Sequence, residues 1–361
     1  MSNMKNMKFI LTIIGVLIMI SHSYAQSKHQ FEYANPEAKG YSSEKLEVLK
    51  KHLQDSGSSS MIILVDGSVI FEWGEVNKKH LIHSMRKAIL NSLYGIAISN
   101  GQIDTSMTMK ELKIDDIKPK LKGREKKARI VDLLKSRSGI YHNAAAVNNG
   151  MLKDRPKRGT HKPGEYYYYN NWDFNVLGAI LEQETGKTIY DLFYDAIAKP
   201  IGMLDYHGEY TSIDGEAEDY KIPDTDGYYK FEKSQSKYPA YHFRMSTRDL
   251  ALYGQLYLNY GVWNGKQILS QEWIDLSTQP YSIYSPEYGS AYGMLWRVRV
   301  PNEYTTRNSF YHTGLGIHML GIYPDSKLVM VHRVNTESDF DYNEGDFYKM
   351  LNLLFNARGN E

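Results

Sequence analysis

Strand-like segments lie near both ends of this chain, and helix-like segments lie between them. Two short apolar runs, 61–65 and 69–73, flank a turn at Asp66-Gly67 and predict a β-hairpin near the N-terminus. Strand-like runs return only late in the chain, at 292–300, 309–311, 319–323 and 328–334. We therefore expect one sheet that is assembled from both ends of the chain, with a cleft where it meets the intervening segment.

The segments between these strands show helical periodicity. Leucines at 46, 49 and 53 predict a helix over 42–55, and helical patterns also cover 84–100, 130–135, 172–184, 188–198, 247–259, 270–278 and 341–356. The polar segment 213–237 is interpreted as a long loop. This pattern predicts a discontinuous α/β sheet domain of residues 26–102 and 246–361, with an inserted, mainly helical domain of residues 103–245.

Composition excludes several classes of protein. With 42% hydrophobic and 24% charged residues, the chain is expected to fold rather than to remain disordered. Its net charge of +1 gives no electrostatic reason to expect a nucleic acid partner. The absence of cysteine rules out disulfides, thiolate nucleophiles and Cys-ligated zinc.

Residues 1–25 have the pattern of a secretory signal peptide. Lys5 and Lys8 precede an apolar run over 9–20, and a small-x-small cleavage site follows at 23–25. Twelve helical residues span roughly 18 Å, less than the ~30 Å hydrocarbon core of a bilayer. We expect a periplasmic or secreted protein with no stable membrane anchor after cleavage; an uncleaved anchor is the alternative.

Ser84 and Lys87 have the spacing Ser-x-x-Lys at the start of a predicted helix. Residues three apart lie on one face of a helix, so the lysine amine can reach the serine hydroxyl. A serine hydroxyl becomes an effective nucleophile when a neighbouring base takes its proton. The same spacing also occurs at Ser2, Ser42 and Ser234, so the motif alone is weak support for catalysis.

A second polar segment, residues 163–171, precedes another predicted helix and contains four consecutive tyrosines. A phenol beside a lysine can relay the proton that leaves the serine, and a carboxamide can bind a substrate amide or carbonyl. Tyr169 with Asn171, or Tyr168 with Asn170, would supply this pair. Asparagine is also common in turns, and a tyrosine run also forms ordinary half-buried surface.

Residues 311–316, with the sequence Tyr-His-Thr-Gly-Leu-Gly, combine a strand edge with two glycines. Small residues let a substrate approach the backbone closely. A main-chain N–H at this edge, together with that of Ser84, would form an oxyanion hole. On its own, such a segment is equally typical of an ordinary glycine-containing edge strand.

These three motifs, in this order, resemble those of the serine β-lactamase and penicillin-binding superfamily. The chain is most similar to its class C β-lactamase-like serine hydrolases, which include esterases, D-amino peptidases and 6-aminohexanoate-dimer hydrolases. Four further segments are similar to family patterns, namely 130–139, 199–203, 246–254 and 261–265. The resemblance covers about residues 42–335 and implies an α/β (α+β) fold, in which helices flank an antiparallel sheet.

The resemblance also implies roles for the residues of the first two motifs. Ser84 would be the acyl-accepting nucleophile, and Lys87 would be its base or proton partner. Tyr169, six residues after Pro163 as in the family, would be the relay, and Asn171 would contact the substrate. The register one residue earlier is the competing assignment.

In the third motif, His312, Thr313 and Gly314 would line the cleft, and the N–H groups of Leu315 and Ser84 would form the oxyanion hole. His312 stands where β-lactamases and transpeptidases usually have a lysine that attracts a substrate carboxylate. An unperturbed histidine is mostly neutral at pH 7. The departure therefore favours an esterase or amidase over an efficient β-lactamase.

Arg86, inside the first motif, is a second departure. A permanent cation beside Lys87 would lower the proton affinity of the lysine if the two side chains face each other. The sequence does not decide whether Arg86 faces the cleft or points away from it.

We expect an exported serine hydrolase that forms an acyl-enzyme on Ser84 and acts on a small ester, amide or peptide substrate. β-Lactamase or D,D-peptidase activity, or a non-catalytic cell-wall or glycan-binding relative of the same fold, are the alternatives. No cofactor is expected, and a catalytic metal is the least favoured reading because the chain has no His-Glu-x-x-His pattern.

Overall fold

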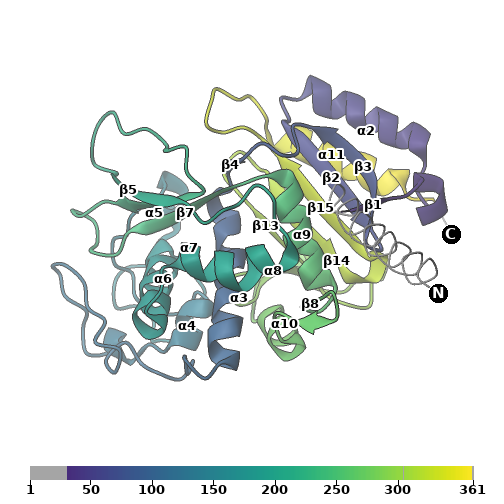
Figure 1. Cartoon of the computed structure of the whole chain (residues 1–361). Coiled ribbons are helices and arrows are strands. Elements are labelled where there is room, and N and C mark those ends of the chain that lie inside the picture. Colours follow the sequence, from purple (N-terminus) through teal and green to yellow (C-terminus); the bar gives the residue numbers. More distant parts are fainter. Residues whose placement is uncertain (1–30, 304, 360–361) are drawn as a thin grey trace, which may run out of the picture.

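The computed structural model describes residues 31–303 and 305–359 (Figure 1). The predicted signal peptide of residues 1–25 lies outside these residues. In the described part of the chain, the largest sheet has nine strands in the order β1-β3-β2-β15-β14-β13-β12-β11-β10. Their bounds are β1 Glu32–Tyr33, β2 Ser60–Val65, β3 Ser68–Gly74, β10 Ser282–Ser285, β11 Ser290–Tyr292, β12 Arg297–Arg299, β13 Ser309–Thr313, β14 Met319–Tyr323 and β15 Leu328–Arg333.

The two ends of the chain meet in the middle of this sheet. Strand β2 pairs antiparallel with β15, so that Ile63 lies opposite Met330. All neighbouring pairs are antiparallel except β1 with β3. The predicted fold class, an antiparallel sheet built from both chain ends and flanked by helices, is confirmed.

The alternation of side chains along β2 explains why both faces of the sheet are covered. Met61, Ile63 and Val65 pack with the apolar faces of α2 (Ser43–Asp55) and α11 (Glu344–Ala357). Ile62 and Leu64 point to the opposite face, into the larger core that includes α3 (Arg86–Ser99) and α9 (Thr247–Leu258). Because β2 is buried on both faces, it reads as a continuous apolar run.

The helical part of the molecule packs beside this core (Figure 1). Helix α6 is its longest element and packs against both α3 and α4. The helices are α4 Ile130–Leu134, α5 Asn149–Asp154, α6 Asn171–Thr185, α7 Ile189–Phe193, α8 Lys199–Ile201 and, nearer the sheet, α10 Gln271–Ser277. In the described residues, no helix combines the length and the apolar character that a membrane crossing requires.

A second sheet, of order β4-β7-β6-β5, leads the chain to the first motif. Its strands are β4 His80–Leu81, β5 Tyr210–Asp214, β6 Gly227–Phe231 and β7 Ala240–Met245; a small hairpin, β8 Val262–Trp263 with β9 Lys266–Gln267, stands apart. This sheet joins a strand from before the predicted inserted domain to three strands within it. The domain boundaries at 103 and 245 stay a prediction.

Two expectations were wrong in detail. The segment 213–237 is not one long loop, because it contains β6 and the end of β5; β5 is half-exposed and polar, so it lacks an apolar strand signature. The expected strand over 292–300 is two strands, β11 and β12, separated by a turn in which Leu295 has a φ of 63°.

Candidate active site

Ser84 lies between β4 and α3, where the chain turns from the second sheet into the helix. A short 3-10 helix, His83–Met85, makes this turn, and α3 begins at Arg86. His83 has a φ of 47°, a left-handed conformation that is strained for a residue with a side chain. Its ring is held by a 2.7 Å hydrogen bond between Nε2 and Thr336 Oγ1. The strained turn therefore presents Ser84 at the start of α3 in a defined position.

Lys87 is completely buried, and its Nζ donates a 3.1 Å hydrogen bond to Ser84 Oγ. The same Nζ lies 4.8 Å from the ring centroid of Tyr169 and 4.6 Å from that of Phe174. Burial lowers the pKa of Lys87 well below its ordinary value, and the charges of Arg86 and Arg297 act in the same direction. A lysine in this setting can lose its proton and serve as a base.

Tyr169 comes from the segment that enters α6, and its ring faces the Lys87 amine. Burial raises the pKa of the Tyr169 phenol, while the charge of Arg297 and a hydrogen bond with Ser84 act in the opposite direction. The ring also lies 5.0 Å from that of Phe174 and 6.5 Å from that of His312. The structure thus brings Ser84, Lys87 and Tyr169 together.

The alternative register places its two residues elsewhere. The Tyr168 hydroxyl donates a 2.6 Å hydrogen bond to the carbonyl of Met151. Asn170 caps the N-terminus of α6, and its Nδ2 donates to the carbonyl of Ile140. Neither side chain is engaged with Ser84 or Lys87, whereas the Tyr169 ring lies beside the Lys87 amine, so the geometry favours Tyr169 as the relay. The role of Asn171 stays a prediction.

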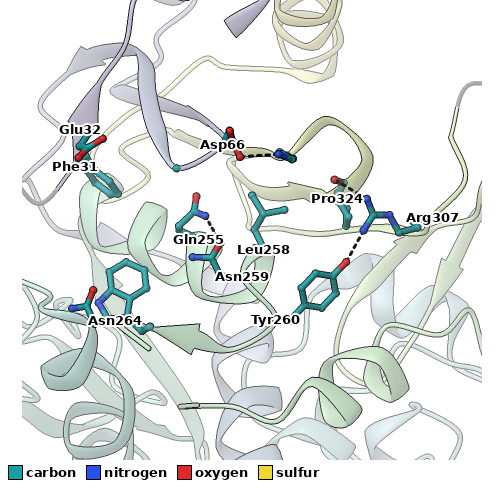
Figure 2. A pocket seen from close by; sticks show the side chains of 13 residues that line it. Phe31, Glu32, Asp66, Gln255, Leu258, Asn259, Tyr260, Asn264, Arg307 and Pro324 are labelled. Atoms are coloured by element: carbon teal, nitrogen blue, oxygen red, sulfur yellow. Dashed lines mark hydrogen bonds and ion pairs between the residues drawn. The ribbon is translucent and has the colours of Figure 1, made fainter. Parts of the chain in front are cut away.

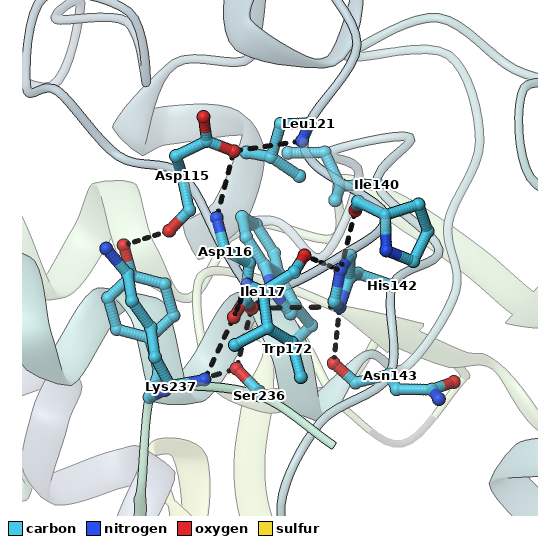
Figure 3. A network of polar contacts seen from close by, with 12 residues as sticks. Asp115, Asp116, Ile117, Leu121, Ile140, His142, Asn143, Trp172, Ser236 and Lys237 are labelled. Carbon is cyan, nitrogen blue, oxygen red and sulfur yellow. Dashed lines mark hydrogen bonds and ion pairs between the residues drawn. The ribbon is translucent and has the colours of Figure 1, made fainter. Parts of the chain in front are cut away.

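Asn171, the first residue of α6, is held by a hydrogen bond to the backbone of a neighbouring loop. Its Nδ2 donates to the carbonyl of Ala146, and its Oδ1 is buried without a partner in the described part of the chain. The next residue, Trp172, donates from Nε1 to Asp116 at 2.7 Å (Figure 3). Asp116 is completely buried and also accepts a 2.6 Å hydrogen bond from Ser236 Oγ. This network fixes the start of α6, and with it Asn171.

His312 lies in β13, completely buried, with its Nδ1 3.1 Å from the carbonyl of Thr313. Its Nε2 has no hydrogen-bond partner among the residues that the structure describes. Burial lowers the pKa of His312 well below its ordinary value, and the charges of Lys87 and Arg297 add to the effect. His312 is therefore neutral at pH 7 and does not supply a positive charge.

The residues that follow His312 are tightly packed as far as the turn between β13 and β14. Thr313 is partly exposed, and the N–H of Gly314 donates to the carbonyl of His318 at 2.9 Å. A Cβ at Gly314 would lie only 2.0 Å from His318 Nε2 and 2.8 Å from the carbonyl oxygen of Ile82, so this position requires glycine. Leu315 is 62% exposed, at the turn between β13 and β14.

Arg297 is a site residue that the sequence reasoning missed. It lies in β12, opposite Tyr311 of β13, and its guanidinium carbon is 5.6 Å from the ring centroid of Tyr169. Its Nη1 donates a 3.1 Å hydrogen bond to the Tyr284 hydroxyl. The neighbouring strand therefore places a permanent cation beside Tyr169, and the charge of this cation also acts on His312. Consecutive strands usually pair, so a hairpin between the two predicted strands was the signal that would have revealed it.

Arg86, whose direction the sequence left open, points inward. It is only 3% exposed, its Nη1 donates to the carbonyl of His83 at 3.2 Å, and its guanidinium carbon lies 5.2 Å from the ring centroid of Tyr241. Its Nε and Nη2 have no hydrogen-bond partner among the described residues.

A separate cavity of about 640 Å³ lies away from these residues (Figure 2). Its lining includes Asp66 from the β2–β3 turn, Lys327 from the β14–β15 turn, and Tyr260 and Arg307; no residue of the three motifs lines it. It lies near Pro324, just after the Tyr323 end of β14, whereas Thr313 of the third motif pairs with Met319 at the other end of that strand. In residues 31–303 and 305–359, no group of His, Asp or Glu side chains converges as metal ligands would.

Ser84 lies directly before one helix and Lys87 in its first turn, and an interior strand of the antiparallel sheet, β13, leads into the His-Thr-Gly segment, not an edge strand as the sequence suggested. This is the arrangement of a β-lactamase-fold hydrolase. The chain matches the Beta-lactamase family over residues 49–354 and belongs to this family.

The individual relatives are distant. A Salmonella paratyphi A protein assigned as a D-alanyl-D-alanine carboxypeptidase is 24% identical over 241 residues, and the match covers 55% of each chain. The chain thus spans about half the length of the curated relatives it matches.

Solved structures show the same fold. A protein from Bacillus anthracis assigned as a 6-aminohexanoate-dimer hydrolase has a TM-score of 0.65 and 20% identity, covering 91% of this chain and 87% of that chain. A family VIII carboxylesterase has a TM-score of 0.61 and 14% identity, with coverages of 90% and 98%. The family thus includes esterase-like, amidase-like and carboxypeptidase-like hydrolases.

Proposed function

We propose that this protein is an exported serine hydrolase that cleaves an ester or amide through an acyl-enzyme on Ser84. The observation that carries the proposal is the buried Lys87 amine, 3.1 Å from Ser84 Oγ and without a carboxylate partner among the described residues. A lysine held this way is suited to take a proton rather than to form an ion pair. The family membership and the ester- and amide-cleaving relatives support the same class of reaction.

The proposed reaction has two halves. In the first, neutral Lys87 takes the Ser84 proton, Oγ bonds to the substrate carbonyl carbon, and the N–H groups of Ser84 and Leu315 stabilise the oxyanion. The bond to the leaving group then breaks, and Tyr169 relays the proton to the departing oxygen or nitrogen. In the second half, water attacks the acyl carbon and returns the proton to Ser84, releasing the acid.

An acyl-serine probe tests this proposal. A fluorophosphonate should label the purified protein, and Ser84→Ala should abolish labelling. Ser234→Ala is a matched control, because Ser234 has the same spacing to Lys237 but lies in an exposed segment. Labelling that survives Ser84→Ala, or is lost in Ser234→Ala, would overturn the assignment of the nucleophile.

A second candidate is D,D-carboxypeptidase activity, and Arg297 is the observation that favours it. Its guanidinium lies beside Tyr169, where it is suited to bind the terminal carboxylate of a peptide. Comparison of a p-nitrophenyl ester, a D-Ala-D-Ala peptide and a chromogenic cephalosporin separates the activities. Turnover of none of them, together with tight binding of a glycan or muropeptide, would favour a non-catalytic binding protein instead.

Export is part of the proposal and rests on the sequence of residues 1–25. Expression of the full chain in a bacterial host should yield a periplasmic or secreted protein that begins at Gln26. N-terminal sequencing of the mature protein checks this. A protein that keeps Met1 and stays with the membrane fraction would indicate an uncleaved anchor.

A further inference from the structure

Arg86 is a buried cation with no counter-charge. Its side chain is 3% exposed, and in the described part of the chain it forms no ion pair with any carboxylate. Glu337, a carboxylate held near the same strand β7, is bound instead by Arg244 at 2.8 Å. Burying an unpaired charge is unfavourable, so a charge retained in this state calls for a functional reason.

The groups around Arg86 leave its charge uncancelled. From its own turn it faces His83 and Lys87, and from β7 it faces Tyr241 and His242. The charge of Arg86 also acts to lower the pKa of Tyr228 in β6 and of the more distant Tyr169 and His312. Burial and this charge lower the pKa of His83 to about 3 and that of His242 well below its ordinary value, so both rings are neutral. The field of Arg86 therefore reaches Lys87 undiminished by a carboxylate.

Lys87 has its own surroundings, which also contain no negative charge among the described residues. It faces the Ser84 hydroxyl, the rings of Tyr169 and Phe174, neutral His312 and the cation of Arg297. The Arg297 guanidinium is itself held by a hydrogen bond that it donates to the Tyr284 hydroxyl. Arg86 is thus the cation adjacent to Lys87 in the chain, held rigidly by the His83 carbonyl and the Tyr241 ring.

We propose that Arg86 is a positioning residue for the proposed hydrolysis, whose unpaired charge adds to the burial of Lys87 in keeping its amine free of a proton, so that it can accept the proton of Ser84. This inference rests on the proposed function of Ser84 and Lys87. It accounts for the two guanidinium nitrogens left without partners, because a carboxylate that satisfied them would also cancel the charge. This role also explains why the arginine cation Arg86 lies inside the Ser-x-x-Lys motif, whose lysine must act as a base.

The test is the pH dependence of kcat/KM for a p-nitrophenyl ester, or of the rate of fluorophosphonate labelling. Removal of the charge in Arg86→Gln should let Lys87 hold its proton more tightly, so the acidic limb should move up by about one pH unit or more. Below that limb the rate should fall about tenfold, and raising the pH should restore it. Arg86→Lys keeps the charge and should keep the limb near its wild-type position.

Arg248→Gln is a matched control, because Arg248 is paired with Asp205 and does not act on Lys87. It should leave the limb unchanged. If Arg86→Gln lowers the rate equally at all pH values, Arg86 is only structural and the inference fails. If Arg86→Gln does not fold, Arg86→Met replaces it as the variant without the charge. Its acidic limb should then move up, while the limb in the labelling profile of Arg86→Lys should stay near its wild-type position. Absence of any Ser84 labelling in the wild type would instead refute the proposed function itself.

Discussion

Replacing His332 by glutamine should make the protein less sensitive to acid. His332 lies in β15, completely buried, with its Nε2 2.9 Å from Ser58 Oγ and its ring 4.9 Å from that of Tyr342. Burial, together with the charges of Arg333 and His52, lowers the pKa of His332 to about 3. The folded protein therefore keeps this ring neutral under conditions in which the unfolded chain protonates it.

The sign of the effect follows from these two states. The unfolded chain binds a proton below its ordinary histidine pKa of about 6.5, whereas the folded protein does not until about pH 3. The stability that depends on the neutral ring is thus fully present above about pH 6.5 and is lost as the pH falls toward 3. At pH 5 the loss from this single residue is about 2 kcal/mol, a large part of the stability of a typical domain.

Urea unfolding, followed by tryptophan fluorescence at pH 7 and pH 5, measures this effect. Glutamine can still pair with Ser58 but does not titrate in this range. The difference in unfolding free energy between wild type and His332→Gln should therefore change by about 2 kcal/mol in favour of the variant at pH 5. The exposed His207→Gln variant controls for loss of an imidazole at the surface. A wild-type-to-variant difference that is the same at both pH values would refute the reasoning.

Three further outcomes are expected. Gly314→Ala should lower the melting temperature and the esterase rate, because its Cβ would collide with His318, at a cost of about 1–3 kcal/mol; an unchanged thermal transition would contradict this. Trp172→Phe should destabilise the fold by about 1–3 kcal/mol in urea unfolding, because buried Asp116 loses a donor, and equal stability would show that water replaces it. Tyr169→Phe keeps the ring beside the lysine but removes the relay, so probe labelling should slow by about 10²-fold or more; labelling at the wild-type rate would exclude Tyr169 from the relay.

Local patterns were sufficient to predict much of this architecture. The β2–β3 hairpin and helix α6 follow from short-range signals, a turn at Asp66-Gly67 and the helical pattern over 172–184. The placement of strands at both ends predicted that the sheet would be built from both. By contrast, β5 was missed because its polar, alternating residues carry no apolar signal, and it forms a strand only by pairing with β6.

The candidate site shows the same division between local and long-range information. The contact between Lys87 and Ser84 follows from helical spacing, so the sequence alone predicts it. The direction of Arg86 depends on packing against Tyr241, which is distant in the chain, and the position of Arg297 depends on the pairing of β12 with β13. Spacing within a motif cannot report such contacts between distant segments.

The pairing of β2 with β15 also governs when this molecule can fold. Ile63 acquires its partner Met330 only when nearly the whole chain is available. At synthesis rates of about 5–20 residues per second, the apolar β2–β3 hairpin waits on the order of tens of seconds for its neighbour. A nascent chain therefore cannot complete its central sheet before synthesis is nearly finished. It also means that a chain ending before residue 328 would lack the strand that joins its two halves.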